Sequence, residues 1–302
     1  AGDAHDKIDL QKSLEVEMDD VGTPAHHAAK NLDVAVLAFL AGSEIGRRLL
    51  TKPRSDGMTI AHVGACASQP QGGTSVAACL AGLLRLPRLG RGTDAQREDA
   101  ELEVLRWTLA EPALGPSLLN MPSADGTTIA HIAAAIGRTH VLRWITTADG
   151  LGPSLLRQPR RDGWTIAHCA AKNGQFVVLN WIRDESGVSQ ELFSALADGG
   201  LSIAHVAATA GRTDVLGWIG GLGASLLERP RCDGWTIAHC AAEKGQVAVL
   251  RWILDEPALG TEPLVAQAND GASIAHVAAA GGRTNVLRWI LTSTADGLGP
   301  SL

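Results

Sequence analysis

The sequence predicts an all-α protein built from stacked helix–turn–helix repeats. A stretch of 21 residues, DGWTIAHCAAKNGQFVVLNWI at 162–182, returns almost letter for letter at 233–253. A Ser or Thr followed three residues later by His recurs along most of the chain, and an aromatic residue follows each regular His by 13 positions. Self-similarity at a fixed spacing of this size is the signature of a solenoid, in which each repeat buries its apolar face against its neighbours.

The repeated histidine stands in the sequences TPAH, TIAH and SIAH. The seven copies are His26, His62, His131, His168, His205, His239 and His276. They are separated by 36, 69, 37, 37, 34 and 37 residues, and the value of 69 spans about two units. The aromatic residues that follow are Phe39, Trp144, Trp181, Trp218, Trp252 and Trp289, with Trp107 in the irregular unit.

Each unit has the signals of two helices. The hydroxyl residue three positions before the His is a helix N-cap, and an Ala-rich first helix follows it. Glycines predict a left-handed end to this helix, and they are Gly137, Gly174, Gly211, Gly245 and Gly282. A second helix carries the apolar stripe Val-Leu-x-Trp-Ile. Paired apolar residues after it, such as Leu155 and Leu156, predict an extra short helical turn.

These units resemble ankyrin repeats, whose signature is a β-turn, T-P-L-H-x-A-A-x-x-G and a second apolar helix. The resemblance covers roughly residues 20–290. Only Thr23–His26 keeps the proline, and Ala stands where the family usually has Leu. We expect this Ala to make room for the aromatic of the second helix. The resemblance implies an all-α ankyrin-repeat solenoid with short β-turn fingers and a role in protein–protein recognition.

The predicted organisation is an acidic N-terminal cap or tail at residues 1–20, followed by a single array of about seven repeats at 21–302. One unit is interrupted by an inserted helix or loop at about 67–97, so that its second helix is expected at 98–110. An eighth, degenerate repeat is the alternative explanation of the 69-residue interval. The chain begins without Met and ends in the middle of a unit, so we expect it to be a fragment of a longer protein.

Composition restricts the class of partner. The net charge of −6 and the pI near 5.9 provide no basic field for nucleic acid or anionic lipid. Five cysteines without a Cys-x-x-Cys spacing favour reduced thiols in the cytoplasm or, for a secreted effector, in a host cytosol. No Sec signal and no membrane span is recognisable. The expectation is a soluble, monomeric chain in which Cys169 and Cys240 are buried and Cys232 is exposed.

Enzyme and metal chemistry are not indicated. Neighbouring helices pack ~8–10 Å apart, whereas two nitrogens on one zinc ion lie within about 4 Å of each other. Equivalent histidines therefore cannot share a metal, and we expect them to bond backbone groups of the neighbouring turn. The motifs G-x-x-x-x-G-K-[ST], H-E-x-x-H and G-x-S-x-G are all missing from the sequence. The prediction is a protein that is not an enzyme and has no cofactor.

The variable positions predict a docking surface for another protein. Trp164 and Trp235 stand between the turn Gly and the helix cap, where an aromatic is a typical binding anchor. Packing on the adjacent turn is the alternative for both rings. The resemblance places these residues and their polar neighbours on a concave face. The neighbours are Arg161, Asp162, Lys172, Asn173, Asp233, Glu243 and Lys244, and Met58 takes the place of the tryptophan in an earlier unit.

Two further functional classes stay open. The chain could be the target-recognition segment of a larger enzyme or secreted effector, which its ending in mid-unit favours. It could also be an inhibitor or immunity-type protein that blocks an enzyme by inserting residues 70–95. The flanking reading frame distinguishes the first class, and deletion of the inserted segment distinguishes the second.

Overall fold

The computed structural model describes residues 22–65, 94–112, 114–147 and 151–293. The chain forms two compact units, unit 1 over Ala1–Arg161 and unit 2 over Asp162–Leu302, and each is described by itself. Three predictions lie outside the described residues: the N-terminal cap at 1–20, most of the insertion at 67–97, and the end of the array beyond residue 293. The described residues contain helices, turns and one isolated bridge, with no strand.

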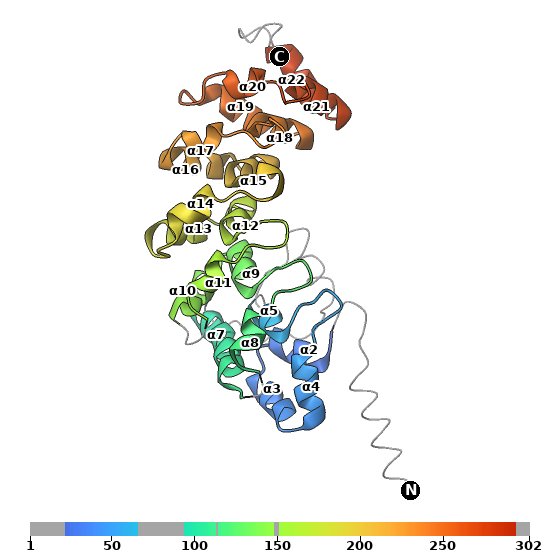
Figure 1. The fold of residues 1–302 in the computed structure, drawn as a ribbon, viewed down its shortest axis with the longest axis vertical. Coiled ribbons are helices and arrows are strands. Elements are labelled where there is room, and N and C mark those ends of the chain that lie inside the picture. Colours follow the sequence, from blue (N-terminus) through green and yellow to red (C-terminus); the bar gives the residue numbers. More distant parts are fainter. Residues whose placement is uncertain (1–21, 66–93, 113, 148–150, 294–302) are drawn as a thin grey trace. The chain divides into compact units, whose positions relative to one another are not determined.

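Unit 2 repeats a fixed order of a first helix, a second helix and a short third helix (Figure 1). The first set is α12 (Ile166–Asn173), α13 (Phe176–Asp184) and α14 (Ser189–Ser194). After the 3-10 turn η1 (Asp198–Gly200) come α15 (Ile203–Thr209), α16 (Thr213–Leu222), α17 (Ser225–Glu228), α18 (Ile237–Lys244), α19 (Val247–Asp255), α20 (Glu262–Val265), α21 (Ile274–Ala280) and α22 (Thr284–Ser293). The first helices α12, α15, α18 and α21 stack side by side in this order.

Unit 1 is built on the same order. Its helices are α2 (Pro24–Lys30), α3 (Val34–Ala41), α4 (Glu44–Thr51), α5 (Ile60–Ala65), α7 (Asp94–Ala110), α8 (Gly115–Asn120), α9 (Ile129–Ile136), α10 (Thr139–Thr147) and α11 (Ser154–Arg157). The delayed second helix is α7, and its predicted start at residue 98 was wrong. It begins at Asp94, because Asp94-Ala-Gln-Arg is itself good helix sequence that extends the first turn.

Each described first helix begins at the predicted hydroxyl residue. In α12 the backbone N–H of the N-cap Thr165 donates to Nδ1 of His168 over 3.2 Å. Because Nδ1 is an acceptor, the imidazole carries its proton on Nε2, which donates to the carbonyl of Leu201 in the next repeat over 3.1 Å. His205 makes the corresponding bond to Trp235. The predicted histidine contacts are confirmed, and three further pairs make them: His26 with Met58, His62 with Thr127 and His239 with Ala272.

The predicted helix ends and third helices are also confirmed. The five glycines have φ between 66° and 86°, in the left-handed region that residues with a Cβ avoid. In the third helix α14, Leu192 and Phe193 are 2% and 7% exposed. In α11, Leu155 and Leu156 are buried as well. The extra residues of each unit therefore add a short helix that closes the core from one side.

The tryptophans of the second helices are less uniformly buried than the repeat pattern predicts. Trp144, Trp181 and Trp289 are buried, whereas Trp107, Trp218 and Trp252 are half-buried. The contacts of Trp218 give the reason, because its ring packs on residues of the preceding repeat, among them Phe193 at 5.4 Å. A ring that lies between two repeats leaves an edge at the surface. Phe39, the aromatic residue at the equivalent position of α3, departs furthest from the predicted burial and is 82% exposed.

A second set of inter-repeat bonds explains the two subtypes of repeat, which carry Gly-Arg-Thr or Gly-Gln after the first helix. The guanidinium of Arg212 donates to the carbonyl of Lys172, near the end of the preceding first helix, over 3.3 Å. The amide of Gln246 donates in the same way to the carbonyl of Thr209 over 3.3 Å. Arg283 completes the series with a bond of 2.7 Å to Glu243. Each repeat thus satisfies carbonyls that the preceding helix cannot bond itself.

Candidate partner-binding surface

The surface around Trp164 is formed by a finger and the first helix that follows it. The backbone N–H of Trp164 donates to Oδ1 of Asp162 over 3.2 Å, which fixes the turn. The indole ring lies 6.0 Å from the imidazole of His168 at an interplanar angle of 37°. The ammonium of Lys172 lies 5.3 Å from the centre of the same ring. Trp164 is half-buried, so one part of the ring packs on α12 and another meets solvent.

Trp235 repeats this arrangement two repeats further on. Its N–H donates to Oδ1 of Asp233 over 3.1 Å, and its ring stacks on His239 at 6.0 Å and 29°. On this ring the cation is Arg231, whose guanidinium carbon lies 5.1 Å from the ring centre. Arg231 also forms an ion pair of 2.9 Å with Asp233. The ring of Trp235 is half-buried between the finger and α18.

The prediction that both tryptophans project from the turn needs correction. Each ring lies 6.0 Å from the His of the first helix that follows it, so it packs back on that helix. The alternative of packing on the adjacent turn stays open for both rings. Both rings keep a solvent-facing part, as a binding anchor requires.

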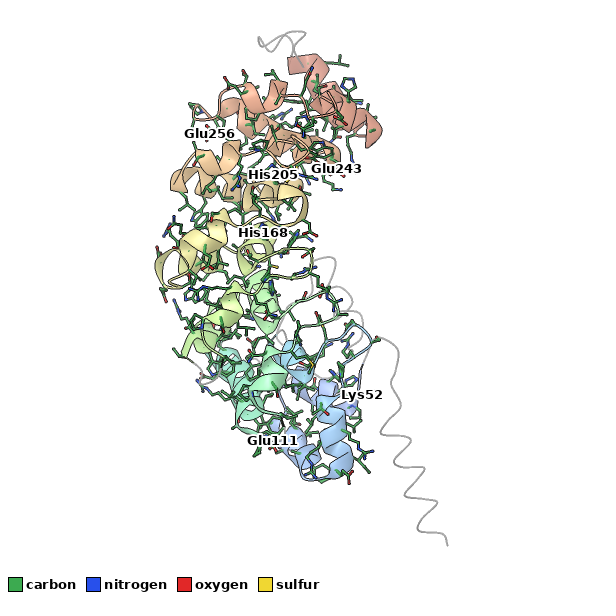
Figure 2. The ribbon with its side chains drawn as sticks, in the orientation of Figure 1. Lys52, Glu111, His168, His205, Glu243 and Glu256 are labelled. Carbon is green, nitrogen blue, oxygen red and sulfur yellow. The ribbon has the colours of Figure 1, made fainter. Side chains whose placement is uncertain are left out.

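The polar neighbours differ between the two sites. Lys172 and Asn173 are exposed, and the amide of Asn173 donates back to the carbonyl of Cys169 over 2.9 Å. At the second site Glu243 is half-buried, Lys244 is exposed, and the two form an ion pair of 3.0 Å. Figure 2 shows Glu243 on the side of unit 2 where the first helices lie and Glu256 on the side of the second helices. The first site therefore has a positive charge beside its ring, whereas the second site has charges of both signs.

Two predicted site residues belong to unit 1. Met58 is 5% exposed, so its side chain is enclosed by the residues around it, although its carbonyl accepts the same kind of bond from His26 that Trp235 accepts from His205. A side chain so little exposed offers no surface to a partner, and we remove Met58 from the candidate site. Arg161 is exposed, and its N–H donates to the carbonyl of Asp125 over 3.1 Å.

Arg231 and the histidines beneath the tryptophans were not predicted as parts of this surface. The spacing of four residues between each tryptophan and its histidine is a usable signal, and so is the Arg-x-Asp spacing of the finger. Burial lowers the pKa of His168 and of His239, whereas their bonds to backbone carbonyls raise it. The rings below the tryptophans are therefore neutral at neutral pH.

Among the residues that the structure describes, no group of three or more His, Cys, Asp or Glu could hold a metal ion. Cys240 is buried, which raises the pKa of its thiol to about 11, so it is a poor nucleophile. Cys232 is exposed, and Cys169 is buried, as predicted. No helix in the described part of the chain is long and apolar enough to cross a membrane.

Three features recur about every 37 residues: a capped Ala-rich helix, an aromatic second helix and a finger that bonds to the next finger. Together they define a helical repeat solenoid whose fingers and first helices present side chains to solvent. Residues 204–298 match a family model of ankyrin repeats in three copies. This part of the chain is identified as ankyrin repeats, in agreement with the repeated units described above. Repeats of this family generally serve as protein–protein interaction modules and are typically not enzymes. No curated protein matches the chain.

Proposed function

We propose that the chain binds another protein on the finger and first-helix side of unit 2, with Trp164 and Trp235 as anchors. The main support for this proposal is that two large aromatic rings at equivalent positions keep a solvent-facing part, whereas the other repeated features take part in packing. Trp is enriched among the residues that dominate binding energy, often with at least about 2 kcal/mol each. Lys172, Asn173, Asp162, Asp233, Glu243 and Lys244 form the polar surroundings, and Arg161 stays a predicted member.

The charges beside the rings suggest what the partner presents. The ammonium of Lys172 stands over Trp164 and is exposed, so an acidic group of the partner is favoured there. Arg231 is already paired with Asp233, so the region of Trp235 has less net charge to offer. The net charge of −6 supports a protein partner over nucleic acid or a membrane. The described cysteines form no disulfide, which suits a monomer in the reducing cytosol.

Site-specific photo-crosslinking in the full chain tests this proposal. A benzophenone amino acid replaces Lys172 on the proposed surface or, as the matched control, the exposed Arg251 on the second helix α19. In an extract of the producing cells, we expect a crosslinked product from position 172 and none from 251. Trp164→Ala combined with Trp235→Ala is expected to remove the product while the helical circular dichroism signal persists. An equal product from position 251, or one that survives both substitutions, would show that this surface is not the binding site.

A further inference from the structure

The second helix α3 in unit 1 has an apolar face at the surface. Its sequence VAVLAFLA contains no polar residue. Leu37 and Leu40 are buried, whereas Val36 is 41% and Phe39 is 82% exposed on the other side of the helix. A helix that is apolar all round is normally covered on all sides, and an exposed apolar patch of this kind marks a contact surface.

Unit 2 shows what covers the equivalent position. Trp218 stands there in α16, and its Nε1–H donates to Oδ1 of Asn180 over 3.0 Å. The ring of Phe193 meets it edge-on at 5.4 Å, and the guanidinium of Arg183 lies 5.9 Å from its centre. All three neighbours belong to the preceding repeat, on α13 and α14. The aromatic of a second helix is therefore covered by the second and third helices of the repeat before it.

The spacing along the chain locates the corresponding residue for Phe39. Phe193 precedes Trp218 by 25 residues, and the same interval separates four other pairs: Leu119 and Trp144, Leu156 and Trp181, Leu227 and Trp252, Leu264 and Trp289. Counting back 25 residues from Phe39 reaches Leu14. Leu14 also precedes its helix cap, Thr23, by nine residues, as Phe193 precedes Ser202. Both intervals agree with the repeat, so Leu14 is in register with a third helix.

The composition of the N-terminal segment fits the same position. Leu10 and Met18 lie four residues on either side of Leu14, the spacing of side chains on one helix face. Residues 1–21 hold seven acidic residues and two lysines. The neighbouring helix α4 exposes Arg47 and Arg48, of which Arg48 is paired with Glu44 over 2.9 Å. An acidic segment with an apolar stripe is complementary to an apolar helix beside a basic one.

We propose that residues 1–21 cover α3 and that Leu14 packs on Phe39 as Phe193 packs on Trp218. The segment takes the place that a preceding repeat has elsewhere in the array. The occupant of this surface is thus a part of the same chain, in contrast to the partner protein proposed for unit 2, and the two proposals are independent. Eight residues lie between Leu14 and the cap Thr23 of α2, as many as between Phe193 and Ser202, so no longer linker is needed.

Limited trypsin digestion of the full chain, read by mass spectrometry, tests the contact through cleavage after Lys12. Phe39→Asp and Leu14→Asp are each expected to speed this cleavage about tenfold, the change in open population when roughly one buried apolar contact is lost. Val177→Asp is the matched control, because Val177 is 64% exposed on the second helix α13, and it should leave the rate unchanged. Phe39 and Leu14 are altered separately, so misfolding of one variant leaves the other informative.

Equal cleavage in the wild type and both variants would overturn the proposal. Analytical ultracentrifugation of the same proteins tests the competing occupant, a second copy of the chain. The proposal predicts the same sedimentation coefficient for the wild type and Phe39→Asp. A wild-type dimer that Phe39→Asp separates into monomers, with cleavage unchanged, would assign the surface to a second copy instead.

Discussion

Acidification from pH 7 to pH 4 is expected to weaken unit 2 through its repeated histidines, and His205 allows the size to be worked out. Burial, helped by the positive charge of Arg231, lowers the pKa of His205 from 6.5 to about 4, although its bond to the carbonyl of Trp235 raises it. A proton on Nδ1 would also remove the acceptor of the N–H of Ser202. The folded state therefore requires the neutral ring.

The sign follows from proton binding. Below pH 6.5 the unfolded chain protonates His205 while the folded chain does not, so stability falls with pH until the folded value near 4 is reached and then stays level. The difference of about 2.5 units, at about 1.4 kcal/mol each, is a loss of about 3 kcal/mol. Burial also lowers the pKa of His62, His168 and His239, so these histidines add to the loss in the same direction.

Urea unfolding followed by tryptophan fluorescence at several pH values measures this loss. His205→Gln is the informative variant, because glutamine keeps a side-chain donor and does not titrate. It is expected to be less stable than the wild type at pH 7 but to lose about 3 kcal/mol less between pH 6.5 and pH 4. Since the other histidines are present in both proteins, the difference belongs to His205. Parallel pH curves for the two proteins would refute the reasoning, as would an NMR titration of His205 with its midpoint near pH 6.

Two further predictions concern packing and thiol chemistry. Trp144→Ala removes a ring that is 9% exposed and should lower the free energy of unfolding by about 3–5 kcal/mol. The exposed control Arg251→Ala should change this free energy by less than about 0.5 kcal/mol. Urea unfolding measures both, and a loss below about 1 kcal/mol for Trp144→Ala would contradict a core role. Ellman's reagent on the native chain should modify Cys232 quickly and leave Cys240 intact until the chain unfolds. Peptide mapping identifies the modified residue, and rapid labelling of Cys240 would show that its surroundings open readily.

The sequence predicted the parts of this fold that depend on local pattern. The cap at Thr165 and the left-handed Gly174 follow from residues within ten positions, repeated often enough to be recognised. The bond of His168 to Leu201 spans 33 residues, and it was expected because the same His recurs in each repeat. The bond from Arg212 to Lys172 spans 40 residues and depends on how two repeats stack. No local pattern contains that information, although the alternation of Arg and Gln at this position was visible.

The candidate site was predicted less completely than the fold. Trp164 and Trp235 were recognised because no structural role in the repeat explained them, and their half-exposure is consistent with that reasoning. Their contact with a histidine, and the stacking of Arg231, depend on side-chain rotamers that a sequence does not specify. Met58 was included by position alone, and its burial shows that equivalent positions in a repeat differ in exposure.

The bonds between repeats give the array a direction. Arg212 and Arg283 reach back to carbonyls of the helix before them, whereas His168 and His205 donate forward to the turn after them. Cutting the array between two repeats would therefore leave two different surfaces. The later piece would expose the aromatic residue of its second helix. The earlier piece would expose imidazole donors and backbone carbonyls that have lost their hydrogen-bond partners. A shortened or extended array therefore needs an apolar capping segment before its first repeat and a polar, hydrogen-bonding one after its last repeat. The two capping segments are not interchangeable.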